Sequence, residues 1–155
     1  MIDLLGQIGF TGNFDMSRDS KGRVTTPSPF VKVLKSRYAS EEGALVISIS
    51  LDRGIAVLPV SEWLRRMEKL ESLSDLDESS RTLRTLMAAY SFQSAIDANN
   101  RIRLPAQLLE LCRIGKEVAV IGKISHFEVW DRAVWSDFSK RLDNISEAAQ
   151  RALAH

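Results

Sequence analysis

Two short stretches of this 155-residue sequence place the same residues in the same frame. The first is DSKGRVTTP, from Asp19 to Pro27, and the second is DANNRIRLP, from Asp97 to Pro105. Each has an aspartate, an arginine four residues later and a proline eight residues later. Carboxylate and guanidinium groups at this spacing can pair with each other or bind an external anion, so these two frames are the first candidates for function.

The aspartate of such a frame can hold a tight turn. Its short side chain accepts backbone N–H groups two residues on, so Asp19 and Asp97 are expected to set the direction in which the arginines leave the chain. The planar fork of Arg23 or Arg101 then fits a phosphate, or the O6 and N7 atoms of guanine in the major groove of DNA. For one isolated frame, an Asp–Arg pair across a solvated turn is the commoner arrangement. Duplication and local positive charge favour anion binding here.

The residue directly before the arginine is Gly22 in the first frame and Asn100 in the second. If this position has a positive φ, glycine adopts it without strain. Asparagine is among the few residues with a side chain that tolerate the left-handed region. We therefore expect one turn conformation in both frames.

The frames belong to a longer internal repeat with an offset of 78 residues. Apolar positions match at this offset as well: Phe14 with Phe92, Val24 with Ile102, Phe30 with Leu108, and Leu34 with Cys112. Further along, GIAVLPVSEW matches HFEVWDRAVW, which sets Trp63 opposite Trp135. A repeat of this length predicts two halves of one design.

Apolar periodicity indicates the elements that position the frames. In RIRL, Ile102 and Leu104 alternate with two arginines, the pattern of a strand with one buried and one basic face. Apolar residues at steps of four indicate a short helix after each frame, and β-rich runs then predict a strand hairpin in each half. Helical stripes predict a helical pair over 61–90, with Ser61 as the cap of its first helix, and a final helix at the C-terminus.

Positive charge is concentrated on the frames, although the net charge of the chain is only +1. Residues 18–37 contain six basic residues and one acidic residue, and residues 97–116 contain four basic and two acidic residues. Residues 61–79 have the opposite character, with six acidic and three basic residues. The distribution of charge, more than its sum, therefore indicates an anion-binding surface at the frames.

Several classes of function are not expected from the composition and motifs. A single cysteine and two histidines exclude an internal disulfide and leave too few ligands for a thiolate cluster or a zinc site. The chain has no phosphate loop, HExxH motif, nucleophile elbow or dinucleotide fingerprint, so we expect neither catalysis nor a cofactor. It also has no run of about 18 apolar residues and no signal sequence, which predicts a cytoplasmic protein with no membrane partner.

Four other residues are expected to have structural roles. Trp63 and Trp135 recur at equivalent positions on helical stripes, which favours core packing over stacking on bases. Cys112 lies opposite a core leucine in the repeat, which favours packing over redox sensing. His126 has no Ser, Cys or metal-ligand partner at a usable spacing and is expected in a turn or at the surface.

Two segments of the sequence carry a resemblance to a known family, FTGNFDMSRDSKGRVTTP and IDANNRIRLPAQLLELCRIGKEVAVIGKISHFEVWD. They resemble the MraZ family of bacterial transcriptional regulators, whose members have two AbrB-like (SpoVT-AbrB) swapped-hairpin halves. With the helical linker, the resemblance covers nearly the whole chain. It implies a homo-oligomeric ring that binds short direct repeats in a promoter and controls a division and cell-wall gene cluster. It also implies DNA contact by the motif arginines, here Arg23 and Arg101. The sequence departs from the family pattern at Arg18, usually apolar, and at Asn99 and Asn100, where glycine is usual.

The sequence thus predicts an α+β protein made of two tandem AbrB-like swapped-hairpin β units with packed helices and a pseudo-twofold internal repeat. The expected divisions are a first unit at 10–60, a helical linker at 61–90, a second unit at 91–135 and a C-terminal helix at 136–155. The predicted function is sequence-specific binding to double-stranded DNA by a nucleoid-associated regulator. The alternative is an oligomeric, antitoxin-like module whose hairpins bind a protein.

Oligomerisation is expected to supply affinity, because one ribbon tipped with arginine makes few phosphate contacts. The residues expected to contact DNA are Lys21, Arg23, Arg101 and Arg103. Those expected to form the turns are Asp19, Gly22, Asp97 and Asn100.

Overall fold

The computed structural model describes residues 5–141 and 145–154. Its strands are β1 (Asn13–Ser17), β2 (Arg23–Thr25), β3 (Ala44–Ile49), β4 (Ile55–Pro59), β5 (Ser91–Ala95), β6 (Arg101–Arg103), β7 (Glu117–Gly122) and β8 (Phe127–Asp131). Six of them form one antiparallel sheet in the order β1-β7-β8-β4-β3-β5, and β2 and β6 form a separate two-stranded ribbon. The predicted α+β class is therefore confirmed.

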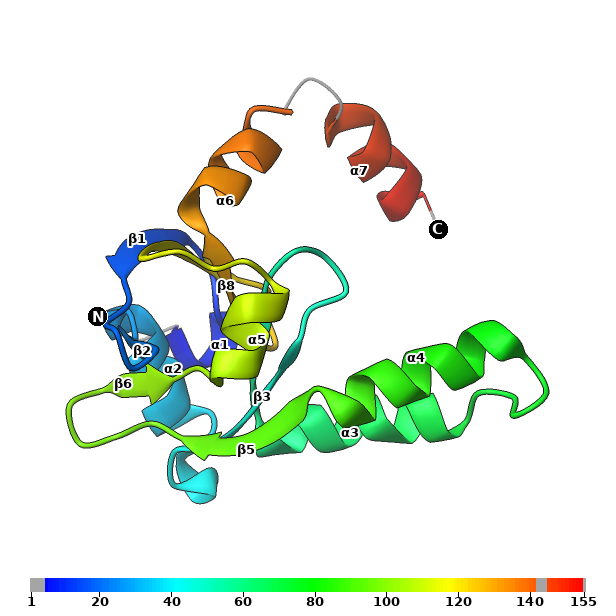
Figure 1. Cartoon of the computed structure of the whole chain (residues 1–155), viewed down its shortest axis with the longest axis horizontal. Helices are drawn as coiled ribbons and strands as arrows, with labels where there is room; N and C mark the ends of the chain where they lie inside the picture. The colour runs from blue at the N-terminus through cyan, green and yellow to red at the C-terminus, as the bar shows by residue number, and fades with distance from the viewer. Residues whose placement is uncertain (1–4, 142–144, 155) are drawn as a thin grey trace.

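The helices surround the sheet and extend from it (Figure 1). They are α1 (Leu5–Ile8), α2 (Ser28–Ser36), the 3-10 helix η1 (Ala39–Glu41), α3 (Val60–Glu71), α4 (Glu78–Ala89), α5 (Ala106–Leu111), α6 (Arg132–Ser139) and α7 (Ile145–Leu153). The pair α3 and α4 projects from the sheet as a long helical hairpin. The helix expected over 136–155 corresponds to the end of α6 and to α7, and residues 142–144 and 155 of that prediction lie outside the described residues. None of the described helices has the length and apolar character that crossing a membrane requires.

The two halves of the repeat complete each other's sheet. Strand β1 of the first half pairs with β7 of the second, and β5 of the second half pairs with β3 of the first, each over five residue pairs. The symmetric strands β4 and β8 pair in the middle, where Ala56 lies opposite Glu128. This exchange gives the sheet the predicted internal repeat, and it makes the two units interdependent.

Burial along each strand follows its place in the sheet. The inner strands β4 and β8 are buried almost throughout, whereas the edge strand β1 alternates between exposed and partly buried residues. An inner strand with both faces covered requires a continuous apolar run, and an edge strand with one open face requires alternation. The runs IAVLP and FEVW therefore reflect the central position of their strands.

Aromatic and aliphatic side chains from both halves form one core. Phe30 on α2 and its repeat equivalent Leu108 on α5 are both almost fully buried. Phe10 belongs to the same core, with its ring centroid 5.4 Å from that of Phe30 and 5.2 Å from that of Phe127. The structural role predicted for Trp135 is also observed, since its ring packs edge-on against Trp130 at 5.6 Å. The repeat alignment thus identified equivalent core positions.

The predicted cap of the first linker helix is wrong. Helix α3 begins at Val60, and Pro59 occupies the N-cap position. Ser61 lies inside the first turn, where its backbone N–H and its hydroxyl both donate to the carboxylate of Glu41, each at 2.8 Å. The carboxylate of Glu41, from η1, accepts a backbone N–H of the first turn of α3, so a serine side chain is not needed as the cap.

His126 lies in the turn between β7 and β8, one of the two expected positions, but it is buried and not at the surface. Its Nε2 atom lies 3.1 Å from the carboxylate of Glu128, which is itself only 3% exposed. The hydroxyl of Ser50 and the indole N–H of Trp130 also donate to this carboxylate, both at 2.9 Å. Burial opposes ionisation of Glu128, but its hydrogen bonds with His126, Trp130 and Ser50, together with the positive charge of Lys123, lower its pKa. The histidine therefore belongs to a buried polar cluster with Glu128, Ser50 and Trp130, next to the start of β8.

Candidate nucleic-acid interface

Asp19 holds the turn of the first frame through its carboxylate. Its Oδ1 atom accepts the backbone N–H groups of Lys21 and Arg23, at 3.0 and 2.8 Å. The backbone closes the same turn, because Gly22 N–H donates to the Asp19 carbonyl at 3.1 Å. The bond from the Arg23 N–H is the main interaction that lowers the pKa of Asp19. The carboxylate is thus an integral part of the turn.

The second frame has the same turn. Oδ1 of Asp97 accepts the N–H groups of Asn99 and Arg101, at 2.8 and 2.9 Å, and Asn100 N–H donates to the Asp97 carbonyl at 3.0 Å. The N–H of Arg101 likewise makes the main contribution to the lowered pKa of Asp97. Gly22 has φ +81° and Asn100 has φ +59°. The left-handed conformation expected at this position is confirmed in both frames.

Each turn is also bound to the opposite half of the chain. The carbonyl of Gly22 accepts the N–H of Leu104, and the carbonyl of Asn100 accepts the N–H of Thr26, both at 2.8 Å. A Cβ atom at Gly22 would lie 2.7 Å from the Leu104 carbonyl oxygen, which real side chains do not approach so closely. Gly22 therefore satisfies two requirements, its φ angle and this close approach.

Each motif arginine pairs with the aspartate of its own frame. The Nε atom of Arg23 lies 2.6 Å from Oδ2 of Asp19, and Nε of Arg101 lies 3.3 Å from Oδ2 of Asp97. The simple Asp–Arg pair is therefore present in both turns. It engages only Nε, and no described residue accepts a hydrogen bond from the terminal Nη atoms of either arginine. The outer edge of each guanidinium, with its two parallel donors, remains available to an anion or a guanine.

Strands β2 and β6 bring the two frames together on one ribbon. Arg23 lies directly opposite Arg103, and Thr25 lies opposite Arg101. Directly opposite residues share a face of an antiparallel pair, so three arginines lie on one face of this ribbon. Like charges in this arrangement repel each other, and an anion bound to the face relieves that repulsion. The sequence did not predict this pairing, because the two strands are far apart in the chain and very short.

The opposite face of the ribbon anchors it to the core. Val24 and Ile102, which lie opposite each other, are each 3% exposed and belong to the central apolar cluster. The alternation predicted for RIRL is therefore observed, with apolar residues inside and arginines outside. Arg103 and Lys21 are exposed, and neither pairs with a carboxylate in the part of the chain that the structure describes.

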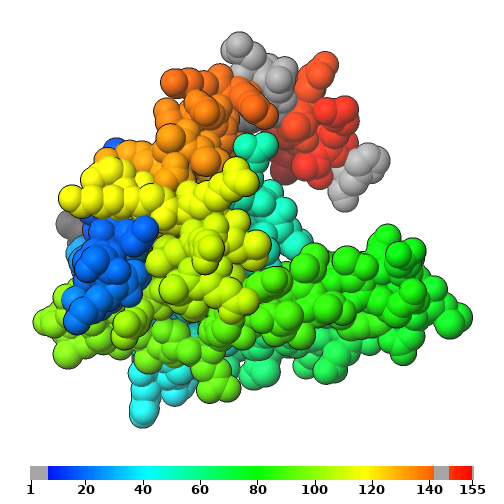
Figure 2. Space-filling view, in the orientation of Figure 1, coloured from blue at the N-terminus to red at the C-terminus, as the bar shows by residue number. Residues whose placement is uncertain are grey.

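A groove with a volume of about 630 Å³ runs beside the ribbon. Thr25, Lys32 and Lys35 of the first half line one part of it, and Asn99 and Asn100 of the second half line another. At this end of the molecule the N-terminal part of the chain lies against segments of the second half, as the space-filling view shows (Figure 2). The basic surface of the first half therefore continues from the ribbon onto α2.

Comparison with known sequences identifies the family. A protein from Shewanella violacea named Transcriptional regulator MraZ is 32% identical over 127 residues, which cover 81% of this chain and 82% of that protein. The protein of the same name from Shewanella oneidensis is 30% identical over the same lengths. This chain belongs to the MraZ family. The sequence model of the family, described as "MraZ protein, putative antitoxin-like", matches residues 87–155.

The match to the MraZ family model contains the second frame and extends to residue 155. The first frame lies before the matched residues. The first frame is related to the second by the internal repeat and by the identical turn geometry. Both frames thus belong to the architecture of this MraZ-family chain.

Arg18 has a role that sequence reasoning missed. The sequence indicated a positive charge and a departure from the pattern of the resembled family at this position, but not its contacts. The guanidinium donates to the carbonyls of Gly115, Ile114 and Asp19, at 2.9, 3.1 and 3.2 Å. These bonds tie the first turn to the loop before β7 of the second half. The only signal in the sequence was the departure at this position from the pattern that the resemblance implies.

Neither a metal site nor a reactive thiol is found in residues 5–141 and 145–154. These residues contain no group of three or more His, Cys, Asp or Glu side chains that could hold a metal ion. Cys112 is partly buried, with its Sγ atom 3.6 Å from the carbonyl of Gly54, and burial raises the pKa of its thiol. A raised pKa keeps the thiol protonated at neutral pH and suits the packing role expected for it.

Proposed function

We propose that this chain is a transcription regulator that binds double-stranded DNA through the β2–β6 ribbon. The observation that carries the proposal is the face of that ribbon, where Arg23, Arg101 and Arg103 lie together and no described residue accepts a hydrogen bond from the Nη atoms of the first two. The relatives named Transcriptional regulator MraZ support the regulatory role. The protein acts without catalysis, in the cytoplasm at the nucleoid.

The ribbon suits the major groove, which is wide enough for two β-strands. In the proposed complex, Asp19 and Asp97 hold Nε of their arginines and direct the Nη atoms toward phosphates or guanine edges. Lys21 and Arg103 add contacts to phosphates, which set the register but carry no sequence information. Three arginines and one lysine per chain make a small contact surface.

That small surface is the reason for proposing a ring-like homo-oligomer on short direct repeats of a promoter. Neighbouring subunits present identical ribbons in the same orientation, and direct repeats offer identical sites at matching intervals. Linked ribbons raise the overall affinity by about two to four orders of magnitude when they bind together. In line with the family resemblance, we propose that the promoter belongs to a division and cell-wall gene cluster.

Binding to the DNA upstream of its own gene tests this function. Fluorescence anisotropy of the full chain with that DNA and with a scrambled duplex is expected to show preference for the former. Affinity for both is expected to fall steeply between about 50 and 200 mM salt, because phosphate contacts release counterions. Equal affinity for the two duplexes at every salt concentration contradicts sequence-specific regulation.

A second candidate follows from the description of the family model as antitoxin-like. In that case the ribbon face binds an acidic surface of a partner protein, and the oligomer is an assembly module. The same titration separates the candidates, because a protein-binding module shows no preference for its upstream DNA over the scrambled duplex.

A further inference from the structure

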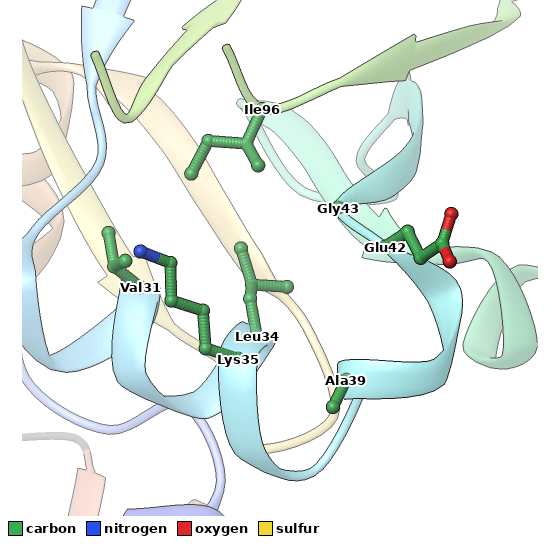
Figure 3. Close-up of a pocket in the computed structure, with 7 residues that line it drawn as sticks. All are labelled: Val31, Leu34, Lys35, Ala39, Glu42, Gly43 and Ile96. Carbon is green, nitrogen blue, oxygen red and sulfur yellow. The ribbon is translucent and has the colours of Figure 1, made fainter. Parts of the chain in front are cut away.

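A small apolar pocket lies between α2, η1 and the end of β5 (Figure 3). Its volume is about 240 Å³, and its walls include Val31 and Leu34 of α2, Ala39 of η1, and Ile96. Gly43 contributes to its shape, since a Cβ atom there would lie 2.8 Å from the Ile96 side chain. A cavity of about 150 Å³ already accommodates a benzene-sized group, so this pocket has room for one large apolar side chain.

The rim of this pocket is basic on the side of α2. The ammonium of Lys35 lies beside Val31, and the carboxylate of Glu42 points away from the other labelled side chains (Figure 3). Lys32 is exposed one turn earlier on the same helix. An apolar group flanked by carboxylates therefore complements this pocket better than one flanked by basic residues.

The tip of the α3–α4 hairpin carries such a group. Leu76 is 93% exposed, the highest value among the leucines that the structure describes. Asp75 and Asp77 flank it directly, Glu78 follows, and all three are exposed. Asp75 pairs with Arg84 at 2.6 Å, and Asp77 caps α4 by accepting the N–H of Ser80, so the loop has a defined shape.

We infer that the tip of the α3–α4 hairpin of one chain docks into the α2–η1 pocket of a second copy, with Leu76 seated on the apolar floor. Two other leucines are also highly exposed, but neither has the matching charge. Leu51 is followed by Asp52 and Arg53, whose opposite charges cancel. Leu153 lies near the positive charge of Arg151. Of these three leucines, Leu76 alone has a carboxylate on each side in the sequence, which suits the lysine rim.

The contact must join different chains. The two helices of the hairpin have 12 residues each, which holds the tip about 18 Å from the sheet. The tip and the α2–η1 region lie at opposite ends of the long axis of the molecule (Figure 1). A contact between two different surfaces is heterologous, and repetition of it generates a ring when the rotation closes.

The docking deepens the proposed function, and it rests on the self-association that is part of that function. Ile96 in the wall of the pocket immediately precedes Asp97, the first residue of the second frame. A neighbour seated in the pocket therefore adjoins the DNA-binding ribbon and fixes the spacing between successive ribbons.

Sedimentation velocity over a range of concentrations tests the contact with the full chain. Leu76→Ser is expected to raise the concentration needed for assembly about tenfold or more, because the apolar side chain no longer fills the pocket. Ala39→Glu, which places a bulky charge in the pocket from an exposed position, is expected to have a similar effect. Leu51→Ser is the matched control, an exposed loop leucine whose loss is expected to leave assembly unchanged.

Thermal melts of wild type and the three variants establish that all four proteins fold alike. We expect this because the three substituted residues are exposed. The inference is overturned if Leu76→Ser or Ala39→Glu assembles at the same concentrations as wild type. It is also overturned if Leu51→Ser impairs assembly as much as Leu76→Ser does.

Cysteine cross-linking gives a second, direct test. In a Cys112→Ser background, Leu76→Cys combined with Ala39→Cys is expected to form a ladder of dimers, trimers and larger species under a mild oxidant. Each single cysteine is expected to form dimers at most, because a ladder needs two cross-links per chain. A combined variant that stops at dimers overturns the inference.

These outcomes are distinguishable from failure of the proposed function. An assembled wild type that does not prefer its upstream DNA rejects the proposed regulation and leaves the docking intact. Assembly of Leu76→Ser together with specific DNA binding rejects the docking and leaves the regulation intact.

Discussion

The two frames share one backbone design but differ in the surface around it. Both turns have the same pattern of aspartate hydrogen bonds and a left-handed residue at the same position, and both arginines pair with their own aspartates. The helix that follows differs: at the repeat offset, Lys32 of α2 corresponds to Glu110 of α5. The Arg23–Asp19 pair is also shorter than the Arg101–Asp97 pair, at 2.6 against 3.3 Å.

This difference separates what the fold requires from what a binding surface requires. The turn geometry cannot diverge, because each turn is bonded to the opposite half and sustains the shared ribbon. The exposed face of the following helix has no such constraint. We therefore expect the first frame to dominate DNA binding and the second to contribute less.

Removal of the motif arginines tests this comparison most strongly. Arg23→Ala is expected to abolish specific DNA binding while the oligomer persists, because loss of one arginine is repeated in every subunit. Arg101→Ala is expected to weaken binding less, since its surroundings are less basic. Anisotropy with upstream DNA measures both, with Arg53→Ala on the β3–β4 turn as the control. Unchanged affinity of Arg23→Ala at physiological salt contradicts the role of the first frame.

Substitutions at the turn position test the conformational identity of the frames. Asn100→Gly is expected to leave stability nearly unchanged, whereas Asn100→Val costs about 1–3 kcal/mol because a β-branched residue is strained at positive φ. Thermal melts decide. If Asn100→Val melts at the same temperature as wild type, the position does not require the left-handed conformation.

The reverse exchange, Gly22→Asn, tests whether the frames are interchangeable. It is expected to be destabilising by about 1–3 kcal/mol although asparagine tolerates the φ angle, because its Cβ atom meets the Leu104 carbonyl. Stability equal to wild type means that the close approach at Leu104 relaxes freely.

Exchange of charge on the two helices tests the difference in surface. Lys32→Glu is expected to weaken DNA binding several-fold, and Glu110→Lys is expected to strengthen it, both more at low salt than at high salt. The same titrations measure both variants. If both variants change affinity equally and in the same direction, charge on these helices does not explain the asymmetry.

The smallest expected effect is the pH dependence of the turns. The pKa values of Asp19 and Asp97 are lowered from the ordinary value of 3.8, so their ionised forms favour the folded state. Their contribution is complete above that value and is lost as the pH falls through the lowered pKa. An Asp19→Asn variant is therefore expected to melt below wild type at neutral pH and to converge with it in acid. A gap that persists in acid contradicts this origin.

Much of the fold follows from local pattern. The alternation in RIRL placed Ile102 inside and Arg103 outside, and the repeat placed Phe30 and Leu108 at equivalent core positions. These features depend on strand and helix periods and on the steric limits of one φ angle, which act within a few residues. The family resemblance and the α+β class were accessible for the same reason, since both rest on residues in fixed frames.

The tertiary structure alone decided which strands pair and which charges are free. Strands β2 and β6 have three residues each and are 78 residues apart, so no local signal indicates that they form a ribbon or that Arg23 faces Arg103. Arg18 looked like a surface charge, but it is bound to carbonyls of the other half. The sequence showed no partner for His126, and the fold places its Nε2 atom beside the carboxylate of Glu128. Hydrogen bonds and burial between distant segments depend on chain packing, and single-sequence periodicity carries no information about that packing.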